Sequence, residues 1–352
     1  MLERAGWDAL AAGQAQAAAA AFREALAADP KNARLHLGAA MAATLDRKDA
    51  DAKDALERAL ALDPKLTRAR VLLGPVLYRL GDLAGAIRTY EALLEGGSGG
   101  SGRAGGSGRA GAGDQIDLRD VTETLERWQR EAELHDRMRH AIGSHFTVSF
   151  EGPSEEALAT EAIESLDRAY WRIGQILGVY PTDPIPVVLY TTEQFRDITR
   201  SPSWAAGAYD GTIRVPMRGA LDKGRELDRV LAHEFTHALV RTLAPQGVPA
   251  WLNEGLAAAL ESGDLGWAAR TLQDTKATVQ LRQLQVGFGR FEGAQAQLAY
   301  ATSAVAVHHL LVEQGGFAIA NLLRDLGAGI DFDAAFLHRM QRPFAEFQDG
   351  PW

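Results

Sequence analysis

The feature that most constrains this chain is a 34-residue period within its first 95 residues. The pieces ALAADPKN and ALALDPKL recur so that Pro30 and Pro64 lie one period apart. A period of this length is typical of helix-turn-helix arrays, in which each pair of helices buries its apolar face against the next pair. Residues 1–95 are therefore predicted to form three stacked helix pairs.

Small and large side chains recur at fixed places in each repeat. The first copy has Gly6, Gly13, Ala18, Phe22, Ala25 and Pro30, and the third has Leu73, Gly74, Gly81, Ala86 and Tyr90. The middle copy keeps Leu37, Gly38, Ala52, Leu56, Ala59 and Pro64, and this alignment needs about two extra residues in the loop near Arg47. The pattern resembles the tetratricopeptide repeat family. That resemblance implies an α-helical solenoid whose concave face binds peptide segments of a partner protein, and a helical spacer without a ligand is the alternative.

Residues 96–113 read GGSGGSGRAGGSGRAGAG and hold ten of the 36 glycines. A Gly/Ser-rich coil of this length is flexible and spans about 23 Å root-mean-square. Natural and engineered linkers share such a composition. The predicted organisation is three repeats over 1–95, a flexible linker over 96–113 and a second domain over 114–352.

Composition excludes several classes of function. The 37 Lys and Arg against 46 Asp and Glu give a net charge of -9, and no basic run is present, which argues against a nucleic-acid partner. Because there is no Cys, a metal site must use His, Asp or Glu. No apolar run is long enough for a membrane span, and no signal peptide opens the chain as given. A soluble protein is expected, either cytoplasmic or exported with its start missing.

After the linker, strands are expected first and helices afterwards. A charged helix is predicted over 118–139, a strand over 145–150, a helix over 155–177 and a strand over 186–190. A hairpin over 206–217 contains Asp210-Gly211, a favoured two-residue turn. From Arg225 onward the pattern is helical. This order predicts an α+β domain.

The sequence AHEFTHALV lies inside that helical pattern and places His233 and His237 four residues apart. One helical turn aligns both imidazoles on one face, which suits zinc. Glu234 can lie beside the open coordination position as the base for a bound water. The other histidines do not extend this site, because their spacing fits no shared helical face.

A third ligand is expected from Glu254 in the following sequence WLNEGL. A loop containing Pro245, Gly247 and Pro249 lets the chain reverse, so that a second helix returns beside the first. Two imidazoles and one carboxylate leave the fourth position of a single Zn²⁺ ion for water, as in catalytic zinc sites. A decayed site or a chance cluster is the alternative.

HEFTHALV followed by WLNEGLAAALE resembles the gluzincin metallopeptidases, closest to the bacterial peptidase MA-like group, over roughly 145–352. The resemblance implies a zincin-like α+β fold in which His233, His237 and Glu254 bind zinc. It also implies that Glu234 is the general base and proton shuttle.

The same resemblance assigns Tyr300 as a catalytic hydrogen-bond donor to the oxyanion, although the Lys-Gly often seen shortly after this Tyr is Thr302-Ser303 here. A half-buried core Tyr is the alternative. Many gluzincins orient a zinc histidine with an Asp one turn after the ligand Glu, where this chain has Ala258. Asn253, Glu261 or a backbone carbonyl must then take that role.

The strand over 212–217 is expected to be the edge strand that pairs with an extended peptide in gluzincins. The combined prediction is a zinc-dependent peptide hydrolase with a repeat domain for docking a substrate or partner. An endopeptidase is favoured, because no Gly-Ala-Met-Glu-Asn-like exopeptidase motif is present. The alternative is an inactive zinc-fold scaffold that acts as an interaction module, which Ala258 and the altered context of Tyr300 favour.

Overall fold

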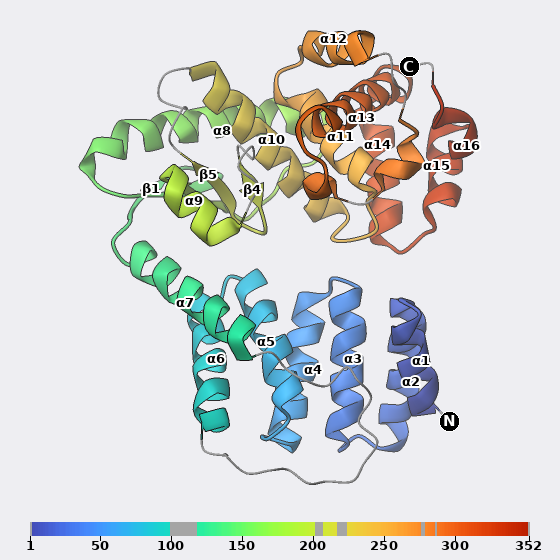
Figure 1. Cartoon of the computed structure of the whole chain (residues 1–352). Coiled ribbons are helices and arrows are strands. Elements are labelled where there is room, and N and C mark those ends of the chain that lie inside the picture. Colours follow the sequence, from blue (N-terminus) through green and yellow to red (C-terminus); the bar gives the residue numbers. More distant parts are fainter. Residues whose placement is uncertain are drawn as a thin grey trace. The chain divides into compact units, whose positions relative to one another are not determined.

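The computed structural model describes residues 2–98, 118–200, 207–216, 224–275, 279–285 and 287–350. The chain divides into two compact units, Met1–Asp136 and Arg137–Trp352, which are coloured from blue to red in Figure 1. Most of the predicted linker over 96–113 lies outside the described residues.

The first unit is a stack of helices in which each helix packs on the next, as Figure 1 shows. Its helices are α1 (Leu2–Ala11), α2 (Ala15–Ala28), α3 (Ala33–Leu45), α4 (Asp49–Leu62), α5 (Thr67–Arg79), α6 (Leu83–Ser98) and α7 (Leu118–His135). Helices α1 to α6 form the three predicted pairs. The predicted α-helical solenoid of three helix pairs is therefore confirmed.

The recurring small residues let large rings fill the space between helices. The ring of Phe22 is fully buried, and a Cβ atom at Gly6 or Gly38 would overlap it. A Cβ atom at Gly74 would overlap the ring of Tyr90 in the same way. Glycine at these positions therefore permits the close helix packing that defines each repeat.

The prediction of two extra residues near Arg47 was wrong. The two helices of every pair are joined by three residues, 12–14, 46–48 and 80–82. The middle residue of each turn has a positive φ: 72° at Gly13, 54° at Arg47 and 81° at Gly81. Gly38 packs on the preceding repeat, whereas the buried Ala40 lies one 34-residue period from the first-helix glycines of the other two repeats.

Helix α7 was predicted to begin the second domain, but it packs on α6 in the first unit. Val121, Leu125 and Trp128 are buried in the core of the repeats. Their spacing of three and four residues gives α7 one apolar face, and the repeats cover that face. The second unit consequently begins at Arg137 rather than at residue 114.

The second unit contains a five-stranded sheet in the order β1-β2-β3-β5-β4. The strands are β1 (Arg139–Ile142), β2 (Phe146–Phe150), β3 (Ile185–Tyr190), β4 (Ala208–Tyr209) and β5 (Ile213–Pro216). β2, β3 and β5 are parallel, and β1 and β4 pair antiparallel with their neighbours. The predicted strands are present, whereas β1 was not predicted.

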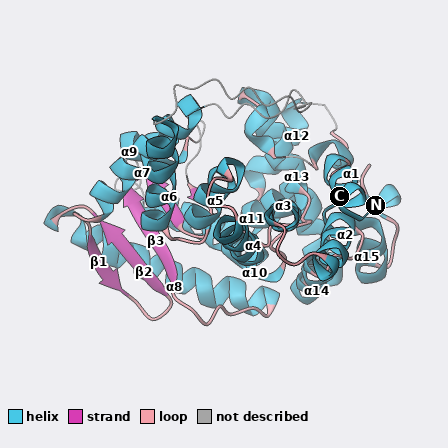
Figure 2. Ribbon diagram, turned by 90° about the horizontal axis from the view of Figure 1, so that it is seen from below, coloured by secondary structure: helices cyan, strands magenta, loops and turns pink. Residues whose placement is uncertain are grey.

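Helices cover this sheet and continue beyond it. They are α8 (Glu156–Leu177), α9 (Thr192–Thr199), α10 (Gly224–Leu243), α11 (Ala250–Glu261), α12 (Gly266–Thr275), α13 (Gly293–Gln314), α14 (Gly316–Gly327), α15 (Phe332–Met340) and α16 (Phe344–Phe347). α8 packs on β1 and β2, and Figure 2 shows it beside the magenta strands. The strands precede most of the helices, as the α+β prediction requires.

The predicted edge strand over 212–217 is an inner strand. β5 lies between β3 and β4, so β4 is the edge. Residues 210–212 connect the two strands, and Asp210 accepts a hydrogen bond from Nε of the buried Arg214 at 3.2 Å. Asp210 therefore also neutralises a buried cation, beyond its predicted role in the turn.

None of the described helices combines the length and the apolar character that crossing a membrane requires.

The positive φ of Arg47 leads to a stability prediction. Arg47→Gly should stabilise the repeat unit by about 0.5–1 kcal/mol, because glycine adopts left-handed backbone without the Cβ penalty. Gly81→Ala should destabilise it for the same reason. Urea denaturation followed by circular dichroism measures both changes, and equal stability of Arg47→Gly and the parent would contradict the argument.

Candidate metal centre

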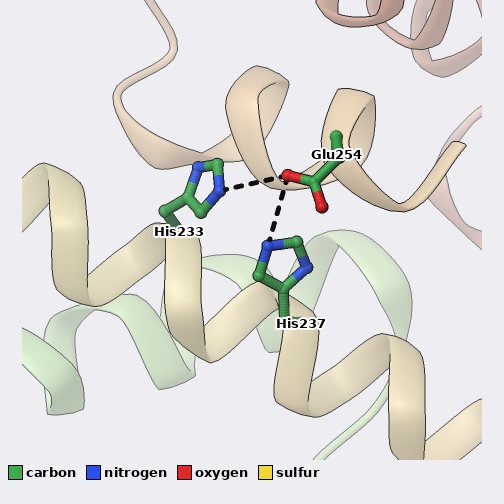
Figure 3. Close-up of side chains that lie close together, drawn as sticks. All are labelled: His233, His237 and Glu254. Carbon is green, nitrogen blue, oxygen red and sulfur yellow. Dashed lines mark ion pairs between the residues drawn. The ribbon is translucent and has the colours of Figure 1, made fainter. Parts of the chain in front are cut away.

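Two packed helices bring the predicted ligands together. α10 carries His233 and His237, and α11 carries Glu254. The loop between these helices reverses the chain, with Gly247 at a φ of 78°. Figure 3 shows the two imidazoles directed toward the carboxylate.

The ligand atoms lie close enough to share one ion. Glu254 Oε2 is 3.7 Å from His233 Nε2 and 3.6 Å from His237 Nε2, and the three ligand atoms lie within 4.8 Å of one another. Zinc bonds of about 2.0–2.2 Å place tetrahedral ligand atoms about 3.3–3.6 Å apart. Among the described residues this is the one cluster of three such groups.

A separate partner holds the other nitrogen of each imidazole. His233 Nδ1 lies 2.9 Å from Oε2 of Glu261, and His237 Nδ1 lies 3.1 Å from Oδ1 of Asn253. In the neutral imidazoles, a hydrogen bond donated by each Nδ1 would leave the lone pair of each Nε2 free to bind a metal ion. Glu261 and Asn253 thus orient one histidine each. Both were among the groups expected to take the role of the Asp that is Ala258 in this chain.

Glu261 is itself held by a cation that sequence reasoning missed. Its side chain is 4% exposed, and Oε1 accepts a hydrogen bond from Nη1 of Arg229 at 2.9 Å. Arg229 also donates from Nε to Glu226 at 3.2 Å. The signal was available, because Arg229 lies one turn before His233 on the same helix.

The charges of the site act strongly on one another. Burial alone would lower the pKa of His233, but hydrogen bonds with Glu254 and Glu261 raise it to about 10. Burial alone would raise the pKa of Glu254, and the charges of His237 and His233 hold it below its usual value. His233 and Glu254 therefore stabilise each other's charged forms.

Glu234 lies beside this cluster without joining it. The residue is 5% exposed, and its Oε2 has no hydrogen-bond partner among the described residues. Burial raises its pKa, although the two histidines oppose that shift. A Cβ atom at Gly207 would lie 2.5 Å from Oε1 of Glu234. Gly207 immediately precedes β4, so the edge of the sheet lies against this carboxylate.

Tyr300 lies beside Glu254. Its hydroxyl is hydrogen-bonded with Glu254, and burial together with that carboxylate raises its pKa well above the usual value. α13 reaches this place because it packs closely on α11, where a Cβ atom at Gly255 would overlap the backbone carbonyl of Ser303. The glycine directly after Glu254 was a signal for this contact that sequence reasoning did not use.

Histidines outside the motif have other partners. His309 pairs with Glu313 at 2.9 Å, and His145 Nδ1 lies 3.0 Å from Asp167. His308 is exposed. None of the three belongs to the group of described residues that could hold a metal ion.

Models of known protein families match parts of both units. The Peptidase MA superfamily model matches residues 165–341, about half of the chain. Tetratricopeptide repeat models match residues 4–66 and 47–101. No curated protein matches the chain. The chain belongs to the Peptidase MA superfamily and carries an N-terminal array of tetratricopeptide repeats.

The bond between Glu261 and His233 leads to a prediction about metal affinity. Glu261→Gln should weaken zinc binding by about 10- to 100-fold, the usual effect of losing a partner of a metal-bound histidine. Competition with a zinc chelator measures this affinity.

Glu292→Gln is the matched control, because Glu292 is exposed. It should leave the affinity unchanged. Equal zinc affinity of Glu261→Gln and the control would show that Glu261 does not orient His233.

Proposed function

We propose that the second unit is a zinc-dependent hydrolase of peptide bonds that acts as an endopeptidase. The observation that carries this proposal is the buried Glu234, whose free Oε2 lies beside a cluster of two imidazoles and one carboxylate. Membership of the Peptidase MA superfamily supports it.

The donor set fits zinc. His233, His237 and Glu254 offer two nitrogens and one oxygen, and three protein ligands with one open position are typical of catalytic zinc. One Zn²⁺ ion bound there would lower the pKa of a bound water to near neutrality and polarise the substrate carbonyl.

Glu234 would move the proton. Its carboxylate accepts a proton from the attacking water as the oxygen bonds to the carbonyl carbon. It then gives that proton to the leaving nitrogen as the carbon–nitrogen bond breaks, so one water and one peptide bond yield a carboxylic acid and an amine. The raised pKa of Glu234 favours its holding the proton between these two steps.

Tyr300 would stabilise the oxyanion. Its raised pKa keeps the hydroxyl protonated, and a protonated hydroxyl can donate a hydrogen bond to developing negative charge. The hydroxyl is hydrogen-bonded with Glu254, so it already lies next to a proposed metal ligand.

An extended peptide is the proposed substrate. β4 is one of the two edge strands of the sheet, and Gly207 before it lies against Glu234. A peptide that adds to this edge would bring its backbone beside the proposed base. The sequence has no motif for a free amine, which favours internal cleavage, and the repeats would dock a protein substrate or partner.

The rival proposal is an inactive scaffold that uses the zinc fold for binding. Its first argument was the Ala258 substitution, and the bond from His233 to Glu261 weakens that argument. Its second argument was the altered context of Tyr300, and the contact of Tyr300 with Glu254 weakens that one.

Three variants separate the proposed base from the proposed ligands. Glu234→Gln should retain about one zinc per chain and lose hydrolysis of a mixed peptide library. Glu254→Gln should weaken metal binding itself, because a neutral amide oxygen is a poorer ligand than a carboxylate, and His233→Ala should lose the metal, because it removes a ligand nitrogen. Metal content after dialysis and peptide cleavage are the two measurements, and exchanged phenotypes would refute the assignment.

Tyr300→Phe tests the oxyanion donor. The variant should keep zinc and substrate binding and lower kcat by about 10² or more, the scale of losing one such donor. Steady-state kinetics measures the change, and an unchanged kcat would return Tyr300 to a packing role.

A further inference from the structure

We propose that α7 is a docked helix, and that its side-chain contacts with α5 and α6 hold the repeats to the peptidase unit even when the chain is cut within residues 99–117. The end of the repeat array is then a receptor surface for an amphipathic helix. This inference goes beyond the proposed function and does not depend on it.

An aromatic anchor carries the contact. Trp128 of α7 is 2% exposed and stacks on Tyr78 of α5 with ring centroids 5.3 Å apart. Its centroid is 4.8 Å from that of Tyr90 of α6. A buried Trp between two aromatic rings is typical of the residues that dominate binding energy at interfaces.

Polar contacts fix the position of α7 along this surface. Glu131 is 1% exposed, and its Oε2 accepts a hydrogen bond from the Tyr78 hydroxyl at 2.8 Å. Gln129 donates a hydrogen bond to Glu91 of α6 at 3.0 Å. A shifted helix would leave the Glu131 carboxylate buried without its hydroxyl partner, which is costly.

The connectivity gives this contact its importance. From α1 to α6, each helix is joined to the next by three or four residues, whereas the 19 residues 99–117 lie between α6 and α7. Three residues, 136–138, separate α7 from β1 of the peptidase unit. The long Gly/Ser-rich connection therefore lies inside the repeat unit, before its last helix.

A cut within residues 99–117 would leave α7 covalently attached to the peptidase unit alone. Its docking on α5 and α6 would then become bimolecular and would lose the effective concentration, in the mM range, that a short linker supplies. The side-chain contacts alone would hold the two fragments together.

The test uses the full chain with a site-specific protease sequence placed within residues 99–117. After complete cleavage, size-exclusion chromatography at a protein concentration of about 10 µM should show the two fragments eluting together. Trp128→Ala should weaken their association by at least about a hundredfold, the usual scale for truncating a buried Trp. Trp171→Ala is the matched control, because Trp171 is exposed, and it should change nothing.

A competition experiment with a peptide of residues 118–136 does not depend on correct folding of the Trp128→Ala protein. Added in excess to the cleaved parent protein, the peptide should displace the peptidase fragment, whereas the same peptide with Trp128→Ala should not.

Three outcomes would overturn the proposal. The first is separation of the cleaved parent fragments at that concentration, and the second is equal retention by the cleaved Trp128→Ala protein. The third is intact protein at twice the mass of one chain that becomes monomeric on Trp128→Ala, which would place α7 on a second copy.

Discussion

The candidate metal centre depends on the packing of α10 against α11, because that contact sets where three carboxylates, two of them buried, meet two imidazoles. Glu234, Glu254 and Glu261 would repel one another without the histidines between them. Arg229 supplies a further positive charge at the outer end, where it holds Glu261. The helix pair therefore balances charge across its interface, and the positions of the side chains follow from that balance.

The sequence was sufficient for the parts of the site that are local or lie in a motif. The spacing of His233 and His237 fixes one helical face, and the loop before WLNEGL explains how Glu254 returns to it. It could not choose between Glu261 and Asn253, because the choice depends on how α11 is rotated and shifted against α10. The structure uses both residues, since Asn253 and Glu261, about two turns apart on α11, each face one of the two histidines.

Elsewhere the sequence predicted the helices and strands themselves better than it predicted which elements pack against them. The sequence pattern contains the apolar face of α7, but periodicity does not indicate which surface packs against that face. In the structure the repeats cover it, and Trp128 is among its buried residues. The strand at β5 was also visible, but its place inside the sheet depends on β4, which has two residues and little pattern of its own. The repeat register failed because Gly38, which packs on Phe22 of the preceding repeat, was aligned with Gly74, which packs on Tyr90 of its own repeat.

The contact between Gly207 and Glu234 has a consequence for access to the site. A hydrogen atom is the one substituent at position 207 that leaves the carboxylate undisturbed, so the room around this acid is set by the backbone of the sheet edge. A molecule that pairs with β4 and a molecule that reaches Glu234 would occupy adjoining space. A compound that pairs with β4 and also reaches Glu234 would block this carboxylate without binding a metal. Its affinity would come largely from backbone hydrogen bonds.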